Sequence, residues 1–478
     1  MLAARYLTWH SFILDLGSYD QKAWLIATRP GIAGMLEQTY RGGVALTPCG
    51  SMRYWGICHF QPLYLLYGLA YRVWPSPLVL LLSQVLLVAS GVVPCYLLAR
   101  ERLESAAAGV LAGALYVLHP AVQFNGLLDF RPDHVAIPFL FWAYWLVERD
   151  RLVPAIAAAA TPALAKQSLM LTFAFFGLYL AWRRGRAAVG LALFAVGLAA
   201  FVAASFYVLA APGRSEAAFM IDRYFSGGAF LDPRLLARKV VYLVALFGPL
   251  GFLSVGSPMS LLPAVPSLAA SLAASDANFT SIASQYSASV VAPAFAALFL
   301  TLPQLARRLG PEAQTLKILA GLVVLSTFFS VAQGPTPLSI GFWIQSWGRQ
   351  WHYSQYLPDR QAVLDEAARL IPTDPDVMVV SQNDVNSARL AHRHFYFPFP
   401  NGLERADYVL LDMGRWPWIY WVPDPERYAE IAHRLRGSVD YRLVFEHEGV
   451  LLFARVGPRH PGAPDLRLAP PLPAGMSQ

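Results

Sequence analysis

Two acidic residues lie five positions apart near the start of the chain, at Asp15 and Asp20. A carboxylate close to a membrane boundary can act as a general base on an acceptor hydroxyl. It can also hold a divalent ion, because hard cations prefer oxygen ligands. The same spacing fits a helix N-cap followed by a solvated acid. Asp15 and Asp20 are therefore candidate catalytic residues, and their spacing alone leaves the structural alternative open.

Polar residues in two later segments could contact an anion. His59 directly precedes an amphipathic stretch, where it lies either at the lipid headgroup level or against an anionic group. The segment 125–134 carries Asp129, Arg131 and His134 between two apolar stretches. Pairing of Asp129 with Arg131 would explain these charges simply. Arg and His beside a membrane-embedded cavity would also suit a phosphate, which Arg binds through two parallel hydrogen bonds.

Lys166 lies between two short apolar runs. A Lys at the bilayer centre costs about 2.5–3.5 kcal/mol, so such residues are usually paired or functional. A position nearer the outer side, from which the long side chain reaches water, would weaken the functional interpretation. Tyr286 is a weaker candidate in the polar segment 278–286. The chain contains no Walker loop, GxSxG or HExxH motif, so soluble nucleotide chemistry is not expected.

The composition is that of a membrane protein. Hydrophobic residues make up 56% of the 478 residues and charged residues 14%, against about 45–50% and about 25% in soluble proteins. The mean hydropathy of +0.43 agrees. These values exclude a disordered chain, a coiled coil and a soluble enzyme with one ordinary core. The net charge of +7 follows from Lys and Arg in cytoplasmic loops, so nucleic acid is not an expected partner.

The residues above must be positioned by apolar helices. Candidate spans cover residues 77–99, 106–128, 134–148, 152–165, 168–182, 187–211, 240–256, 259–273, 288–306 and 315–333. Several are short or contain Pro, and broken helices are tolerated in a membrane where they are buried in protein or line a cavity. We therefore predict an α-helical polytopic membrane protein with about ten or more spans. Its multi-span domain covers residues 77–333 and follows a first outer loop with juxtamembrane helices, residues 1–76.

Basic residues predict the orientation of these spans. They follow the first, third, fifth and ninth spans, at Arg100, Arg102, Arg149, Arg151, Arg183, Arg184, Arg186, Arg307 and Arg308. Cytoplasmic ends collect Lys and Arg, so these ends are expected to be cytoplasmic. The loops 15–76, 125–133, 213–238 and 275–287, and everything after 334, then face outward. This parity leaves two alternatives for the N-terminal segment: residues 1–14 belong to a longer transmembrane helix that begins upstream, which we expect, or the segment crosses the membrane unaided.

The composition changes near residue 340. Strands are expected at 377–381, 408–412, 441–446 and 450–455, and helices at 359–370 and 425–435, which together indicate a small extracytoplasmic α/β domain over 340–457. The Pro-rich tail 458–478 is expected to be disordered. Cys49 and Cys58 share one loop and could form a disulfide if it faces an oxidising compartment, whereas Cys95 is expected to be packed in a helix.

Several short motifs, read together, resemble the DUF2079 family of bacterial and archaeal membrane proteins. They occur in matching order between about residue 12 and about residue 310, and they are Asp15-Leu16-Gly17, Asp20-Gln21, His59-Phe60-Gln61-Pro62, Trp74-Pro75-Ser76-Pro77, Asp129-Phe130-Arg131-Pro132, Gly248-Pro249-Leu250-Gly251 and Ser284-Gln285-Tyr286-Ser287-Ala288. The chain departs from the family pattern at Arg131, where His is expected. It departs again at Gln167 and Ser168, where acids are expected.

The resemblance implies a fold and an activity. The family is grouped with the GT-C glycosyltransferases, multi-span enzymes that take a sugar from a polyprenyl-phosphate carrier and pass it to a lipid, glycan or protein on the outer face. GT-C enzymes place an acid in the first outer loop, which Asp15 matches, with Asp20 as second choice. The candidates for contacting the lipid phosphate are His59, Arg131, His134 and Lys166, with Asp129 and Tyr286 as further substrate contacts.

Two other functions remain open from the sequence. A transporter or flippase of a lipid-linked substrate would also use broken helices and an intramembrane Lys. A binding or scaffold protein would instead use the α/β domain to recognise an outer partner. No cofactor is established, and a divalent cation remains an alternative for the acids. In each case the protein is expected in the cell membrane as a multi-pass protein, in contact with the lipid bilayer.

Overall fold

The computed structural model describes residues 1–36, 59–209, 232–309, 313–344, 351–374, 377–383, 385, 390, 395–399, 403, 406–414 and 425–457. The chain divides into two compact units. The first comprises Met1–Gln38, Leu65–Leu81 and Ser354–Gln478, and the second comprises Thr39–Tyr64 and Leu82–Tyr353. Cys49 and Cys58, which could form a disulfide in an oxidising compartment, lie outside the described residues, as does the tail 458–478, which is expected to be disordered. Cys95 is buried, as expected.

The second unit is helical, as the composition predicts. Its helices are α6 (Val92–Arg102), α7 (Ala106–Leu118), α8 (Pro120–Leu127), α9 (Ala136–Glu148), α10 (Leu152–Ala160), α11 (Ser168–Arg184), α12 (Ala187–Leu209), α14 (Pro233–Phe247), α15 (Val265–Ala273), α16 (Ala288–Leu309), α17 (Ala313–Gln333) and α18 (Ile340–Trp343). Helix α5 (Pro77–Ser90) continues into α6 as one apolar stretch. Short 3₁₀ turns connect several helices, among them η2 (Pro132–Val135), η3 (Thr161–Leu164), η7 (Ala277–Thr280) and η8 (Gln285–Ser287).

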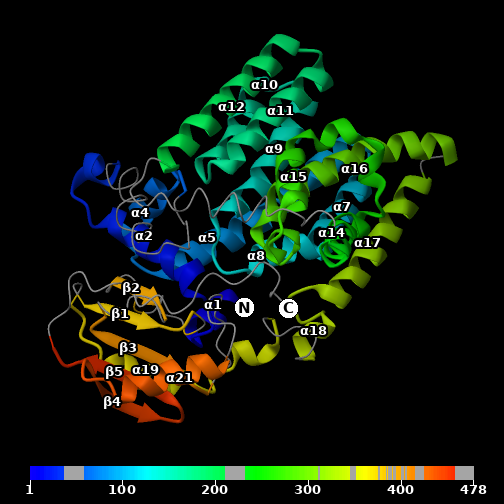
Figure 1. Cartoon of the computed structure of the whole chain (residues 1–478). Helices are drawn as coiled ribbons and strands as arrows, with labels where there is room; N and C mark the ends of the chain where they lie inside the picture. Colours follow the sequence, from blue (N-terminus) through cyan, green and yellow to red (C-terminus); the bar gives the residue numbers. More distant parts are fainter. Residues whose placement is uncertain are drawn as a thin grey trace. The chain divides into compact units, whose positions relative to one another are not determined.

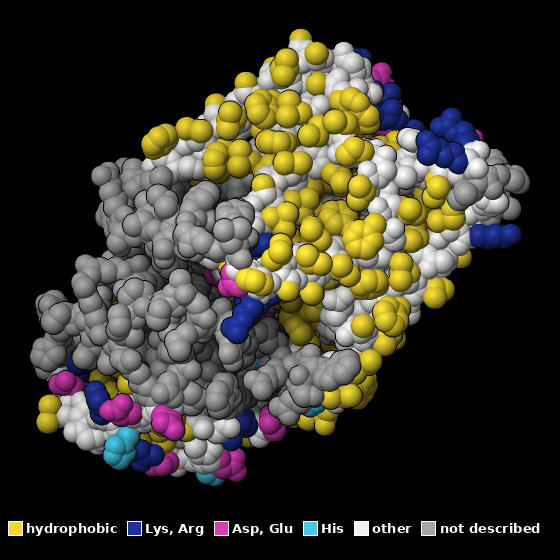
Figure 2. Space-filling model, turned by 45° about the vertical axis from the view of Figure 1, so that its right-hand side comes forward, with side chains coloured by type: hydrophobic (Ala, Val, Ile, Leu, Met, Phe, Trp, Pro, Cys, Tyr) yellow, Lys and Arg dark blue, Asp and Glu magenta, His cyan; other side chains and the backbone are white. Residues whose placement is uncertain are grey.

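Within the described residues, four helical stretches are long and apolar enough to cross a membrane: Pro77–Arg102, Ala187–Tyr207, Gln285–Arg308 and Gln314–Gln333. Helices α7 and α8 would form a fifth span, broken by a bend of 57°. Large apolar side chains are exposed on these helices, including Phe206 (68%) and Val324 (70%). Figure 2 shows hydrophobic side chains spread widely over this part of the surface. Such a surface suits lipid, and the total of about ten spans remains a prediction.

The bend between α7 and α8 has a local cause. Pro120 has no backbone N–H, and the residue before a Pro avoids helical geometry. His119 accordingly has an extended backbone, and its Nδ1 accepts a hydrogen bond from the backbone N–H of Ala121 at 3.2 Å. Its Nε2 lies 3.1 Å from the carbonyl oxygen of Leu246 on α14. The bend is therefore held by side-chain contacts as well as by Pro120.

Helices α11 and α12 pack side by side through small residues (Figure 1). A Cβ added to Gly177 would lie 2.5 Å from the carbonyl oxygen of Gly190, and one added to Gly197 would lie 2.8 Å from the Cα of Ala174. The turn between the helices contains Gly185 at φ 63°, a left-handed conformation that favours Gly at a helix end. Small residues thus allow close backbone contact, the usual means of helix packing in membranes.

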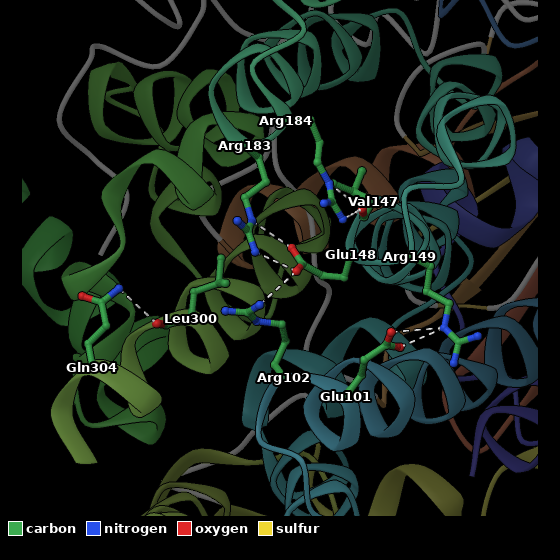
Figure 3. Close-up of polar contacts among 9 residues, drawn as sticks. All are labelled: Glu101, Arg102, Val147, Glu148, Arg149, Arg183, Arg184, Leu300 and Gln304. Carbon is green, nitrogen blue, oxygen red and sulfur yellow. Dashed lines mark hydrogen bonds and ion pairs between the residues drawn. The ribbon is translucent and has the colours of Figure 1, made fainter. Parts of the chain in front are cut away.

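Three helix ends that the sequence assigns to one side of the membrane do lie together. Glu148, at the end of α9, accepts hydrogen bonds from Arg102 of α6 at 3.1 Å and from Arg183 of α11 at 2.7 and 2.9 Å (Figure 3). Arg149 donates to Glu101 at 3.1 Å. The first, third and fifth expected spans therefore end on the same side, as predicted. That this side is cytoplasmic remains a prediction from the charge distribution.

The first unit contains the expected C-terminal sheet. Its strands are β1 (Met378–Ser381), β2 (Phe395–Pro398), β3 (Tyr408–Asp412), β4 (Tyr441–His447) and β5 (Val450–Arg455), in the order β2-β1-β3-β5-β4. Strand β1 pairs in parallel with β2 and β3, and β5 pairs antiparallel with β3 and β4. Helix α19 (Gln361–Arg369) packs against β5, and helix α21 (Pro425–Arg436) packs against β4 (Figure 1). Strand β2 was not predicted, because Phe-Tyr-Phe-Pro shows no alternation and ends in Pro.

The N-terminal residues belong to the same unit as this sheet. They form α1 (Leu2–Leu7), the π-helical turn η1 (Ile13–Gly17) and α2 (Ser18–Ala27), and α4 (Tyr64–Val73) packs against α2. Trp9 is 1% exposed and lies in the core between α19 and the sheet, with Leu364, Val379 and Leu452. Its Nε1 donates to Asp365 at 2.8 Å. Residues far apart in sequence thus share one hydrophobic core, which no local pattern indicates.

Candidate functional site

A buried ion pair lies at the centre of the candidate site in the second unit. The Nζ of Lys166 is 3.3 Å from Oδ1 of Asp133, and the side chains are only 9% and 7% exposed. Lys166 lies in the turn between η3 and α11, and Asp133 lies in η2. The same Nζ is 5.5 Å from the ring centre of Tyr286, within the range of a cation–π contact. Three separate segments therefore meet around one ammonium group.

Tyr286 is fixed by its own neighbours. Its ring stacks on Phe279 of η7, with centroids 3.9 Å apart and an angle of 17° between the planes. The next residue, Ser287, accepts a hydrogen bond from Asn125 of α8 at 2.9 Å. Asn125 also donates to the carbonyl oxygen of Ala121 at 2.7 Å, which fixes its amide. These contacts attach η8 to α8 and hold the aromatic ring beside Lys166.

The loop that carries Asp129, Arg131 and His134 is held by Gln84 of α5. The Nε2 of Gln84 donates to the carbonyl oxygen of Leu128 at 2.6 Å, and its Oε1 accepts from the backbone N–H of Arg131 at 2.9 Å. Asp129 and His134 are each 1% exposed. The His134 ring contacts the carbonyl oxygen of Arg131 through Nδ1. The loop therefore has a defined conformation on both sides of Arg131.

His59 reaches the same region through Gln167, the residue after Lys166. The Nε2 of Gln167 lies 3.1 Å from Nδ1 of His59, and its Oε1 accepts from the backbone N–H of Phe60 at 3.2 Å. The structure thus brings His59 next to the turn that contains Lys166. Of the predicted substrate contacts, Lys166 and Tyr286 are within cation–π range of each other, and the others are connected to this pair by the loop 128–134 or by Gln167.

The two candidate catalytic acids belong to the first unit. Asp15 is half-buried in the π-helical turn η1, a type of turn found frequently at functional sites. Asp20 is fully buried on α2 and accepts a hydrogen bond from Tyr71 of α4 at 2.8 Å. On the same helix, burial lowers the pKa of the Lys22 amine to about 7. His59, Arg131, His134 and Lys166 are called the basic cluster of the second unit. That either acid shares a site with this cluster remains a prediction.

Three residues of the site are not among the predicted contacts: Asp133, Gln84 and Gln167. Asp133 lies in the polar segment 125–134, and the rule that an intramembrane Lys is usually paired predicts that Lys166 has a partner without saying which acid it is. Gln84 and Gln167 act through amide hydrogen bonds between distant segments, which sequence spacing does not show. Within the described part of the chain, no group of three or more His, Cys, Asp or Glu residues is arranged to hold a metal ion.

Comparisons with known proteins agree with this architecture. The model of a family described as "Predicted membrane protein (DUF2079)" matches residues 10–452. The crystal structure of ArnT from Cupriavidus metallidurans in the apo state is 13% identical, with a TM-score of 0.50 over 96% of this chain and 97% of ArnT. The structure of the same ArnT bound to undecaprenyl phosphate is 14% identical, with a TM-score of 0.50 over 97% and 98%. Identities this low show a similar fold alone. No curated protein matches the chain.

Proposed function

This chain belongs to the DUF2079 family of predicted membrane proteins, and from that membership we propose that it is a membrane glycosyltransferase of the GT-C kind. It transfers a sugar from a polyprenyl-phosphate donor to a lipid, glycan or protein acceptor. The reaction takes place on the outer face of the cell membrane, where the C-terminal α/β domain also lies. The similar fold of ArnT, which has been crystallised with undecaprenyl phosphate, supports a carrier of this class.

The buried Lys166 is the observation on which the proposal chiefly depends. An ammonium group that is almost fully buried is costly unless it has partners, and such groups in membrane proteins mark functional sites. Asp133 supplies one partner at 3.3 Å and Tyr286 supplies an aromatic face. Arg131 and His134 lie in the same loop as Asp133, and His59 lies beside Gln167. This combination of donors suits the oxygens of a lipid-linked phosphate.

The proposed reaction assigns one role to each group. Asp15, or Asp20 in its place, accepts the proton of the acceptor hydroxyl. The acceptor oxygen forms a bond with the anomeric carbon of the sugar, and the bond between that carbon and the phosphate oxygen breaks. The electron pair of the broken bond remains on the phosphate, where Lys166 and Arg131 stabilise the added charge. A free polyprenyl phosphate is the second product.

Release of that product tests the proposal. The purified protein in proteoliposomes is supplied with polyprenyl-phosphate-linked sugars extracted from its source organism, and the lipids are analysed by mass spectrometry. We expect free polyprenyl phosphate to accumulate. The substitution of the true general base, Asp15→Asn or Asp20→Asn, should lower the rate by about 10²–10⁴-fold in a protein that still inserts and folds.

Two outcomes would contradict the enzyme proposal. One is an unchanged rate in both variants, which would remove the proposed base. The other is movement of the intact lipid-linked sugar between the leaflets without release of polyprenyl phosphate. That second outcome would instead identify a transporter or flippase.

A further inference from the structure

The side chain of Gln167 connects the ring of His59 to the backbone beside it. Its Oε1 is 3.2 Å from the backbone nitrogen of Phe60, and its Nε2 is 3.1 Å from Nδ1 of His59. All three residues belong to the second unit. A single amide therefore contacts two consecutive residues of the segment that carries the predicted phosphate contact.

The backbone contact determines which way the amide of Gln167 points. A backbone N–H can only donate, so the atom facing Phe60 must be the acceptor, Oε1. The NH₂ group then faces His59, and Nδ1 of the ring must accept its hydrogen bond. In a neutral imidazole one nitrogen accepts and the other carries the proton. The proton of His59 is therefore on Nε2.

We propose that Gln167 is a positioning residue that holds His59 in the tautomer with a proton on Nε2, so that the ring donates a hydrogen bond to an anionic phosphate oxygen. The inference rests on the proposed function for the identity of the anion, whereas the tautomer follows from the contacts of Gln167 alone. Lys166 and Gln167 are adjacent. One turn therefore supplies the buried positive charge of Lys166 and, through Gln167, determines that the neutral His59 ring donates from Nε2. A carboxylate at position 167 would accept from Nδ1 and place the proton on the opposite nitrogen.

Nitrogen NMR of the full-length protein in lipid nanodiscs tests the tautomer directly. The chain contains 10 His, so the protein is labelled with ¹⁵N-His and the His59 signals are assigned by their loss in His59→Asn. The wild type should show an unprotonated Nδ1 and a protonated Nε2. Gln167→Glu should give a protonated Nδ1. Gln304→Glu, the same change at an exposed position of α16 (Figure 3), should leave the His59 signals as in the wild type.

Binding of undecaprenyl phosphate to the protein in the same nanodiscs tests whether the Nε2–H of His59 contributes to phosphate binding. Gln167→Met keeps the side-chain length without adding charge, and it should weaken binding about tenfold, as expected for the loss of an oriented hydrogen bond to a charged group. Gln304→Met should bind like the wild type. Gln167→Met also removes the hydrogen bond to Nδ1, so the His59 signals should then report exchange between the two neutral tautomers, whereas a merely structural role for Gln167 would leave them as in the wild type.

The outcomes separate the two proposals. A protonated Nδ1 in the wild type, or an unchanged His59 in Gln167→Glu, would overturn the role of Gln167 even if undecaprenyl phosphate binds. The expected tautomers without any binding of undecaprenyl phosphate would leave the positioning role standing and would reject the phosphate as its purpose. Both expected results together support the complete inference.

Discussion

Lys166 and Asp133 must be considered as a pair, because each would be a buried, uncompensated charge without the other. Their side chains are 9% and 7% exposed, and the charged atoms are 3.3 Å apart. Residue types in the sequence are enough to identify Lys166 as unusual. The sequence does not identify its partner, since several charged residues lie in the outer segments. The choice of Asp133 depends on how η2 and the start of α11 meet.

Removal of one partner is expected to cost more than removal of both. Asp133→Ala should destabilise the protein by about 3–5 kcal/mol, because it leaves the buried Lys166 charge uncompensated. Addition of Lys166→Met to that variant should recover most of the loss. The free energy of unfolding in detergent, measured for the wild type, both single variants and the double variant, gives the coupling energy.

An exposed ion pair of the same unit serves as the control. Arg149 and Glu101 are 3.1 Å apart, but their side chains are 49% and 34% exposed. Glu101→Ala should therefore cost about 0–1 kcal/mol. Equal losses in Glu101→Ala and Asp133→Ala would show that burial does not govern the Lys166 pair.

At the scale of elements, the sequence predicts apolar helices well because their signal is local. The expected spans at 187–211 and 315–333 correspond to α12 (Ala187–Leu209) and α17 (Ala313–Gln333). The expected span at 106–128 is instead broken at Pro120 into α7 and α8. Hydropathy averages over such a break, whereas the loss of one backbone N–H decides it. Packing between helices is likewise decided by a few small residues.

A methyl group is expected to disturb α11 and α12 at Gly190. Its added Cβ would meet the carbonyl oxygen of Gly177 and, at 2.8 Å, the backbone nitrogen of Ala181, so the helices must separate. Gly190→Ala should lower the free energy of unfolding by about 1–3 kcal/mol, the usual cost of overpacking. The melting temperature in detergent, followed by size-exclusion chromatography, measures the effect.

Gly321→Ala in α17 is the matched control for Gly190→Ala. Nothing lies within 4 Å of a Cβ added there, and Ala is a better helix former than Gly by up to about 1 kcal/mol. Gly321→Ala should therefore leave stability unchanged or raise it slightly. If Gly190→Ala is as stable as Gly321→Ala, close packing of the two helices is not required.

At the scale of the whole molecule, the order of segments in the chain does not reveal which of them share a unit. The sequence predicts a polytopic helical part and a small C-terminal α/β part, and both are present. It does not predict that Trp9 completes the core of the sheet, more than 350 residues from its hydrogen-bond partner Asp365. A short polar stretch with one Trp resembles any loop. Only the contacts of the folded chain show its role.

Removal of the Trp9 ring should therefore destabilise the sheet. Trp9→Ala is expected to cost about 3–5 kcal/mol, as for other large buried aromatic residues. Trp74→Ala changes a residue of the same unit that is 47% exposed, and it should cost about 0.5 kcal/mol or less. Limited proteolysis of the C-terminal part, followed over time, compares the two. Equal cleavage rates in both variants would place Trp9 outside the stabilising core.

In the candidate site, the sequence predicts which residues take part, but it does not predict which residues they contact. The sequence predicts His59, Arg131, His134 and Lys166 from polar residues beside apolar stretches, and the family resemblance adds Asp129 and Tyr286. The structure joins them through Asp133, Gln84 and Gln167. The roles of Asp15 and Asp20 stay predictions from the family resemblance. The account as a whole therefore depends on whether the basic cluster binds a lipid phosphate.

The affinity for undecaprenyl phosphate in lipid nanodiscs measures this most directly. Lys166→Met should weaken binding by about 10-fold or more, because a hydrogen bond to a charged group contributes about 1.5–3 kcal/mol. Lys317→Met, the same change at an exposed position of α17, should bind like the wild type. Equal affinities in the wild type and Lys166→Met, or no binding above that of an ordinary phospholipid, would contradict the account.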